Sequence, residues 1–211
     1  MSESLNNRPM FAGIYGALST PIRQIYMMGA VWKLAQSLPG SQQKILEIGS
    51  WAGLSSLTLA WALDYFAGGG KIHCIDPWLP YVDKSVNHEA FYELQEEAIL
   101  SGDAYKVFLH NTQFAPASVK VTHTQGTSLE VLPTLPDCEF TLVYIDGDHA
   151  YKSVLHDIKQ SSRLIADGGI MCGDDLEVQA IDCHPNLLEL DASLDYVEDT
   201  DAGISFHPGV T

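Results

Sequence analysis

The chain has 211 residues, of which 46% are hydrophobic, and a formal net charge of −16 at pH 7. This length is typical of one ordinary domain, and the apolar fraction is sufficient to fill its core. The acidity disfavours nucleic acid as a partner, because phosphate binding needs a basic surface, and it disfavours an anionic membrane for the same reason.

The four cysteines do not form a CxxC pair, and Cys74 and Cys172 stand in apolar runs. This usage is typical of a reduced protein with buried thiols rather than of a disulfide scaffold. The N-terminal residues contain no apolar signal core, and no apolar stretch has the length of a membrane span. We therefore expect a cytoplasmic protein that does not bind a membrane.

The first predicted element is a helix over residues 20–38. A Thr-Pro pair begins it and a Pro-Gly pair follows it. We interpret Met27, Met28 and Trp32 of this helix as packing residues. Residues 1–18 are expected to be a loose lead-in, and dimerisation through the helix is possible on this pattern.

The stretch ILEIGSWAGLSSLTL, residues 45–59, predicts a strand, a glycine turn and a helix in succession. The strand is expected over residues 44–48 and the helix over residues 53–65. The glycines between them, Gly49 and Gly53, let the backbone come close to a ligand. The helix N-terminus points free N–H groups at the same place.

Strands and helices alternate along the rest of the chain. Further strands are predicted at 71–75, 119–124, 140–145 and 170–172, and helices at 89–100, 104–114, 127–132 and 151–165, with weak strand candidates at 193–197 and 203–206. This alternation predicts a Rossmann-like, doubly wound α/β fold with a mostly parallel sheet and helices on both faces. We expect one domain over 1–211, with a lead-in and cap helix (1–40), a binding core (41–176) and C-terminal strands (177–211).

Ligands of such sheets bind at the carboxyl ends of the strands. Asp76 ends the second predicted strand, where a carboxylate can accept hydrogen bonds from both hydroxyls of a ribose. The glycine turn reads GxxxG and lacks the GxGxxG spacing of a dinucleotide site, and Trp51 would crowd a diphosphate. Glu47, just before the turn, suits a ligand with a cationic amino group.

Two further strand ends carry acidic residues. YIDGDHAY supplies Asp146 and His149, and GGIMCGDDL supplies Asp174 and Asp175. Carboxylates gathered at one cleft repel one another unless protons or a cation intervene, and their oxygens suit a hard cation such as Mg²⁺, Ca²⁺ or Mn²⁺. The alternative is that Asp174 and Asp175 cap the next helix. Asp148 has the pattern of a turn residue.

The sequence EIGSWAG, followed by an acidic end to the next strand, resembles the class I S-adenosylmethionine-dependent methyltransferases. The resemblance implies that S-adenosylmethionine is the cofactor, with the ribose on Asp76 and the adenine near Thr127 and Ser128. The full set of residues that it places at the cofactor is Glu47, Gly49, Ser50, Trp51, Gly53, Ser55, Asp76, Thr127, Ser128 and Asp146. For Ser50 and Ser55, helix capping is an equal alternative.

The two acidic stretches resemble the metal-dependent O-methyltransferases of the catechol type. The resemblance implies that Asp146, Asp174 and Asp175 hold a divalent cation, most simply Mg²⁺, which positions a hydroxyl of a small-molecule acceptor. His149 stands where that type carries a lysine base. IDGDHxY with a later GGxxxxDD is more similar to a bacterial branch that includes macrolide-sugar O-methyltransferases, in which a histidine is the base. His149 and Asp146 are accordingly the predicted catalytic residues.

Three alternatives remain open on the sequence. They are an NAD(P)-dependent oxidoreductase, a non-catalytic nucleoside-binding domain, and a methyltransferase that needs no metal. The acceptor pocket has three candidate residues, Trp78, Tyr81 and Tyr151. Six further histidines are interpreted as surface or packing residues: His88, His110, His123, His156, His184 and His207.

Overall fold

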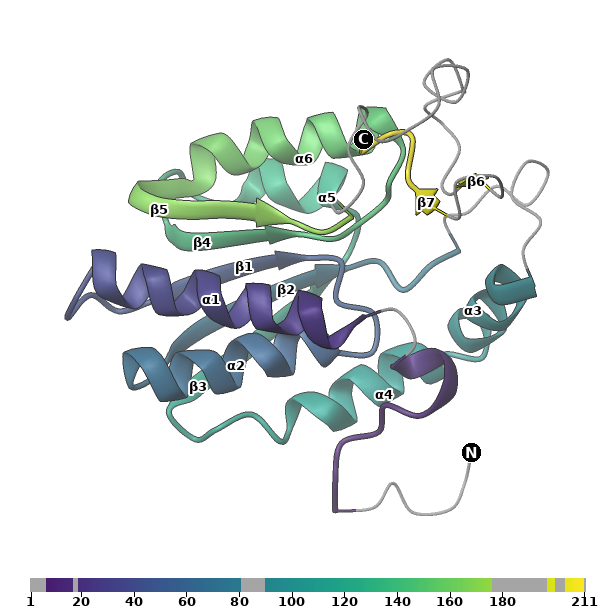
Figure 1. The fold of residues 1–211 in the computed structure, drawn as a ribbon, viewed down its shortest axis with the longest axis horizontal. Coiled ribbons are helices and arrows are strands. Elements are labelled where there is room, and N and C mark those ends of the chain that lie inside the picture. Colours follow the sequence, from purple (N-terminus) through teal and green to yellow (C-terminus); the bar gives the residue numbers. More distant parts are fainter. Residues whose placement is uncertain (1–6, 17–18, 81–89, 176–196, 200–203, 211) are drawn as a thin grey trace.

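The structure is a computed structural model that describes residues 7–16, 19–80, 90–175, 197–199 and 204–210. Its centre is a five-stranded sheet (Figure 1). The strands are β1 (Lys44–Ile48), β2 (Gly70–Asp76), β3 (Val119–Gln125), β4 (Phe140–Ile145) and β5 (Ile165–Gly173). They lie in the order β3-β2-β1-β4-β5, and every neighbouring pair is parallel. The predicted Rossmann-like fold is confirmed.

Helices cover both faces of the sheet, as predicted (Figure 1). One face packs against α1 (Pro21–Ser37), α2 (Leu54–Ala67) and α4 (Asp103–Thr112). The other face packs against α5 (Ser128–Val131), the short 3₁₀ helix η2 (Leu132–Thr134) and α6 (Tyr151–Leu164). Helix α3 (Ala90–Leu100) lies beside α4, and a 3₁₀ turn, η1 (Gly13–Tyr15), precedes α1.

The core divides into two apolar clusters because successive strand residues point to opposite faces of the sheet. Ile45, Ile72 and Leu142 are register partners in β1, β2 and β4, and all three belong to the cluster under α1 and α2. Leu46 and its partner Val143 belong to the cluster under α5 and α6. All five side chains are fully buried. The central strands therefore carry apolar side chains on both faces of the sheet.

Helix α1 begins as predicted, because the Thr20 side chain accepts a hydrogen bond from the backbone N–H of Arg23. Met27 is buried, as predicted, together with Val31 and Leu34. The interpretation of Met28 and Trp32 as packing residues is wrong: they are 39% and 48% exposed. The helix carries two apolar stripes, and only the one through Met27 faces the sheet.

Strand β5 begins earlier than predicted, at Ile165, directly after the end of α6. Its pairing with β4 is irregular between Phe140 and Leu142. Gly169 lies in this irregular part, where an added Cβ would be 2.8 Å from the carbonyl oxygen of Thr141. Gly169 therefore sits in a distorted part of the strand that only a residue without a side chain permits.

The tail contains strands β6 (Val197–Asp199) and β7 (Ile204–Phe206). They pair with each other in antiparallel fashion, and the described part of the chain shows no pairing between them and the main sheet. Residues 193–196 of the predicted strand lie outside the described residues. None of the helices in the described ranges is long and apolar enough to cross a membrane.

Helix α6 has an unusual inner face, because it buries a carboxylate. Asp157 is 1% exposed, and its Oδ1 has no hydrogen-bond partner among the described residues. Burial raises the pKa of Asp157 to about 6, although a hydrogen bond from Ser128 and the charge of His156 oppose the rise; the charge of Asp148 adds to it. The folded protein therefore keeps this proton to a higher pH than an unfolded chain, in which an Asp has a pKa of about 3.9.

We expect Asp157→Asn to raise the free energy of unfolding at pH 8 by up to about 3 kcal/mol, the value of the two-unit difference in pKa. The gain should shrink as the pH falls through 6 and vanish near pH 4, where the wild-type carboxyl is neutral in both states. Urea unfolding of both proteins across this pH range measures the difference. A gain that is independent of pH would contradict the assignment.

Candidate functional site

Backbone hydrogen bonds hold the carboxyl ends of four strands together. The N–H of Gly49, after β1, donates to a carbonyl of β2 at 2.9 Å. The N–H of Asp146, after β4, donates to the last carbonyl of β1 at 2.8 Å, and the N–H of Asp174, after β5, donates to the last carbonyl of β4 at 3.0 Å. The first residue beyond each strand is thereby fixed at one edge of the sheet.

Gly49 is required by this arrangement. Its φ is +82°, and a Cβ added to it would lie 1.7 Å from the carbonyl oxygen of Asp146. Any side chain here would force the ends of β1 and β4 apart. The glycine predicted to approach a ligand is thus also the point at which two strand ends approach each other.

Asp76 organises the loop between β1 and α2. Its Oδ2 accepts hydrogen bonds from the backbone N–H groups of Ser50 (2.9 Å) and Trp51 (2.8 Å), and its Oδ1 accepts one from Trp78 (2.7 Å). Burial raises the pKa of Asp76, and the three hydrogen bonds oppose this rise. The three bonds occupy three of the four lone pairs of the carboxylate, so Oδ1 can still accept one hydrogen bond from a ribose hydroxyl.

Two residues predicted at the cofactor, Glu47 and Gly53, do not line the cavity. Glu47 is fully buried, and its Oε2 accepts hydrogen bonds from the hydroxyls of Ser50 (2.7 Å) and Ser56. Burial raises the pKa of its carboxyl. Gly53 caps α2 with a φ of +83°, and a Cβ added to it would lie 3.2 Å from the ring of Phe108. Both residues support the loop from beneath.

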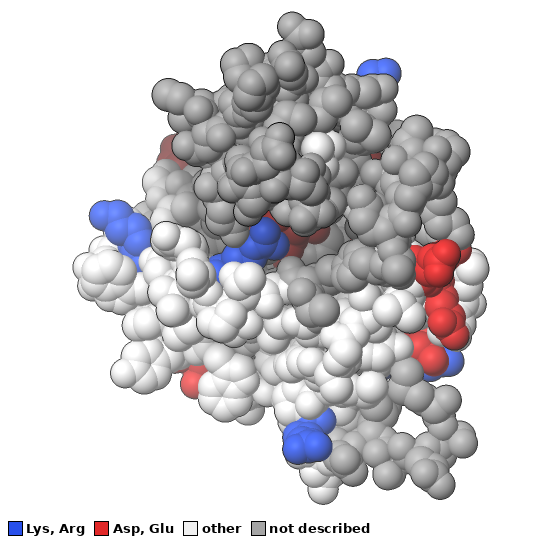
Figure 2. Space-filling view, turned by 45° about the vertical axis from the view of Figure 1, so that its right-hand side comes forward, with Lys and Arg blue, Asp and Glu red and all other residues white. Residues whose placement is uncertain are grey.

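The remaining predicted residues gather around one cavity of about 860 Å³, which is within the size range of small-molecule sites. Its lining includes Gly49, Ser50, Trp51, Ser55, Asp76, Thr127, Ser128, Asp146 and His149. Thr127 also begins α5 in a capping box with Glu130. In Figure 2, acidic and basic atoms lie side by side at a hollow of the surface. The structure thus brings both predicted halves of the site to one space.

The predicted metal ligands form a compact group. Asp146, Asp174 and Asp175 each place a carboxylate oxygen within 4.8 Å of the others. Burial and the charge of Asp146 raise the pKa of Asp174 to about 7. Burial would also raise the pKa of Asp175, but the hydrogen bond and charge of His149 outweigh it and hold this pKa at about 2.

Arg23 of α1 neutralises part of this charge. Its Nη1 lies 2.9 Å from Asp174 Oδ2, and its Nη2 is paired with Asp175 Oδ1. A guanidinium that spans two carboxylates provides a positive charge where a divalent cation would also be stabilised. The oxygen donors fit a hard cation such as Mg²⁺, provided that Arg23 releases them.

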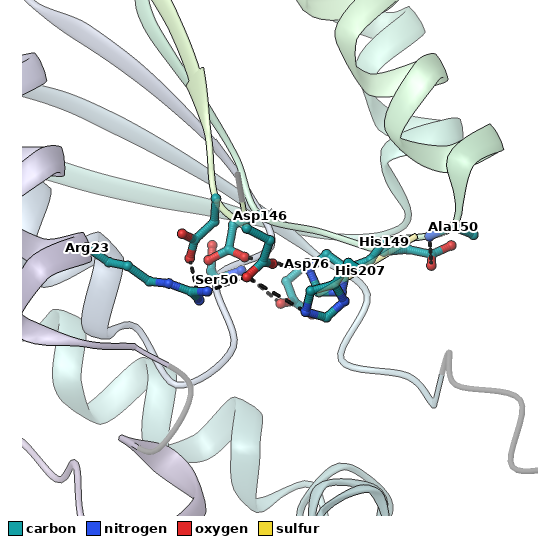
Figure 3. A network of polar contacts seen from close by, with 10 residues as sticks. Arg23, Ser50, Asp76, Asp146, His149, Ala150 and His207 are labelled. Atoms are coloured by element: carbon teal, nitrogen blue, oxygen red, sulfur yellow. Dashed lines mark hydrogen bonds and ion pairs between the residues drawn. The ribbon is translucent and has the colours of Figure 1, made fainter. Parts of the chain in front are cut away.

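His149 faces the same carboxylates from the other side (Figure 3). Its Nε2 lies 2.9 Å from Asp175 Oδ2 and 4.0 Å from Asp146 Oδ1. His207, from the segment after β7, stacks on it with ring centroids 4.0 Å apart and places its Nε2 3.7 Å from Asp175 Oδ1. Asp175 itself has a left-handed φ of +61°.

Two residues of the site were not predicted from the sequence. Arg23 was expected only as part of a helix, and the interpretation of His207 as a surface or packing residue is wrong, because it lies against Asp175. No local pattern marks either one. Of the candidates for the acceptor pocket, Trp78 lines the cavity, Tyr151 does not, and Tyr81 lies outside the described residues.

We expect Gly49→Ala to cost at least about 3 kcal/mol of unfolding free energy, because it adds a backbone clash to the about 1–2 kcal/mol cost of a left-handed residue. Gly40→Ala is the matched control: its φ is +76°, but nothing lies within 4 Å of the added Cβ. Chemical denaturation measures both. Equal losses in the two variants would show that the approach of β1 to β4 is not a constraint.

The chain is similar to several solved structures. An O-methyltransferase from Bacillus cereus in complex with SAH is 17% identical, with a TM-score of 0.45, and the match covers 83% of this chain and 64% of that one. An SAH-bound methyltransferase from Podospora anserina is 18% identical (TM-score 0.42; 75% and 54% covered), and the calicheamicin methyltransferase CalS11 is 16% identical (TM-score 0.45; 74% and 65% covered). The chain thus spans between about half and two thirds of the length of these proteins. No curated protein sequence matches it.

The family model described as a methyltransferase domain matches residues 46–176, which is more than half of the chain. The matched region begins within β1 and ends just after the acidic pair that follows β5, so it includes β2 to β5 in full and most of β1. The chain therefore belongs to the methyltransferase domain family, which confirms its resemblance to the S-adenosylmethionine-dependent methyltransferases.

Proposed function

We propose that this methyltransferase transfers the methyl group of S-adenosylmethionine to a hydroxyl of a small molecule, assisted by a divalent cation. One observation carries the proposal: Asp76, Asp146, Asp175 and His149 line the same cavity. A ribose-binding carboxylate thus shares one space with a group of acids and a base. The acidity of the chain supports a small-molecule acceptor rather than a nucleic acid.

The cofactor side of the cavity is formed by the loops after β1, β2 and β3. Asp76 accepts a hydrogen bond from a ribose hydroxyl on Oδ1, and the turn at Gly49 and Ser50 leaves room for the methionine part. Thr127 and Ser128 lie on the cavity wall after β3, where they contact the adenine. The indole of Trp78 is held by a hydrogen bond to the carbonyl of Trp51 (2.8 Å), which stabilises the wall between these parts.

The acceptor side is formed by the loops after β4 and β5. Asp146, Asp174 and Asp175 would hold the cation, and their oxygen donors would favour Mg²⁺. When bound, such a cation lowers the pKa of the acceptor hydroxyl and orients it. In the absence of the cation, Arg23 balances part of the negative charge of Asp174 and Asp175.

His149 accepts the proton of the acceptor hydroxyl on Nε2, because an imidazole is poised to do so near neutral pH. The 2.9 Å contact of this nitrogen with Asp175 Oδ2 has to open before the transfer, because a carboxylate only accepts hydrogen bonds and so holds a proton on Nε2. The acceptor oxygen then forms its bond to the methyl carbon as the bond from that carbon to sulfur breaks. Positioning of the two reactants can lower the reaction barrier by up to about 7–11 kcal/mol in favourable cases.

Thermal unfolding in the presence of ligands tests the cofactor assignment. S-adenosylmethionine and S-adenosylhomocysteine at 100 times their Kd should each raise the free energy of unfolding by about 2.7 kcal/mol. The Tm should rise by roughly 5–10 °C. We expect NAD⁺ to have no effect, because the GxxxG turn does not accommodate a pyrophosphate. A shift with NAD⁺ alone would favour an oxidoreductase and contradict the proposal.

The metal assignment predicts a second shift with Mg²⁺ that EDTA reverses and that Asp174→Ala abolishes. The Asp174 variant should retain the shift with S-adenosylhomocysteine, because Asp174 does not line the cavity. If Mg²⁺ has no effect on the wild-type protein, the methyltransferase needs no metal, and Arg23 and the histidines at Asp175 balance the acidic group.

Arg23→Gln should raise the affinity for Mn²⁺ or Mg²⁺ at least about fivefold, because it removes the guanidinium that competes for Asp174 and Asp175. Isothermal titration of the cation into the ion-free protein measures the change. Lys33→Gln, an exposed basic residue on the same helix, is the matched control and should leave the affinity unchanged. A lower cation affinity in the Arg23 variant would mean that Arg23 supports the site rather than competes for it.

A further inference from the structure

The pair of histidines at Asp175 has a chemistry that the proposed reaction does not use. His149 follows β4 and His207 follows β7, yet both place Nε2 toward the carboxylate of Asp175, at 2.9 and 3.7 Å. The rings lie against each other with an interplanar angle of 46°. Figure 3 shows the two imidazoles together on the side of the group opposite Arg23. Only the ring of His149 has a role in the proposed transfer.

One ligand atom of each of these three side chains lies within 4.8 Å of the other two. Their side chains are well shielded, with 16%, 5% and 16% of the surface of His149, Asp175 and His207 exposed. Two imidazoles and one carboxylate are donors that borderline transition-metal ions prefer, whereas Mg²⁺ prefers oxygen alone. The group therefore differs in selectivity from Asp146, Asp174 and Asp175, with which it shares one residue.

We propose that His149, Asp175 and His207 form a second ion site, which takes a divalent transition-metal ion such as Zn²⁺. It adjoins the oxygen-donor site and shares Asp175 with it. The consequence for activity rests on the proposed function: an ion on Nε2 of His149 occupies the lone pair that accepts the proton of the acceptor. Zn²⁺ therefore inhibits the transfer by removing the base, while the cofactor site is untouched.

The test uses the full chain freed of metal ions and titrated separately with Zn²⁺ and with Mn²⁺ by calorimetry. His207→Phe retains a ring to stack on His149 but removes the nitrogen donor. It should weaken Zn²⁺ binding at least about tenfold, since even residues that only support ligands have effects of that size. Mn²⁺ binding should change less than about threefold, because the oxygen donors remain. His110→Phe is the matched control. His110 lies on α4, at the other side of the domain, and contacts the carbonyl oxygen of Arg8.

Asp174→Ala gives the converse result: it weakens Mn²⁺ binding and leaves Zn²⁺ on the histidines. The proposal is overturned if the wild-type protein does not bind Zn²⁺, or if His207→Phe and His110→Phe bind it equally well. In activity assays Zn²⁺ should inhibit the wild-type protein and not the His207 variant. A protein that transfers no methyl group but loses Zn²⁺ in His207→Phe would refute the proposed function and leave the ion site standing.

Discussion

The site depends on hydrogen bonds between the backbones of neighbouring strand ends. Gly49, Asp146 and Asp174 each donate an N–H to the strand beside them, so the first residue after β1, β4 and β5 is fixed relative to the next. The sheet thereby positions side chains that are far apart in the sequence to the precision of a backbone hydrogen bond. Asp76 extends this order into the loops, because its carboxylate binds three backbone N–H groups of two different loops.

Electrostatics then decides what this edge can do. Asp146, Asp174 and Asp175 would repel one another strongly in a half-buried cleft without positive charge. The structure supplies that charge from two sides, with Arg23 on one and His149 and His207 on the other. Cations and protons thus compete for the same oxygens. An enzyme that needs a neutral, oriented base beside a polarised hydroxyl can use this competition, because the ligand that binds determines which group is released.

Much of the site at this edge of the sheet could be predicted from local sequence patterns. The basic residues that balance its carboxylates could not. Apolar runs that stop at Asp76, Asp146 and Asp174 mark strand ends, and the parallel fold brings strand ends together. The positions of Arg23 and His207 depend instead on how α1 and the segment after β7 lie against Asp175, which no short stretch encodes. The same limit explains the misassigned stripe of α1: helical periodicity shows that apolar stripes exist, but not which one meets the sheet. Glu47 was expected to face the ligand, and its position below the loop follows from serine partners that spacing alone does not identify.

The most direct test of the central claim is a crystal structure of the protein with S-adenosylhomocysteine and Mn²⁺, in which anomalous scattering locates the ion. We predict a ribose hydroxyl on Asp76, the sulfur facing Asp146, and the ion on Asp146, Asp174 and Asp175 with Arg23 withdrawn from them. A nucleoside bound away from Asp76, or a sulfur that points away from the carboxylates, would contradict the claim that one strand edge holds both the cofactor and the acceptor.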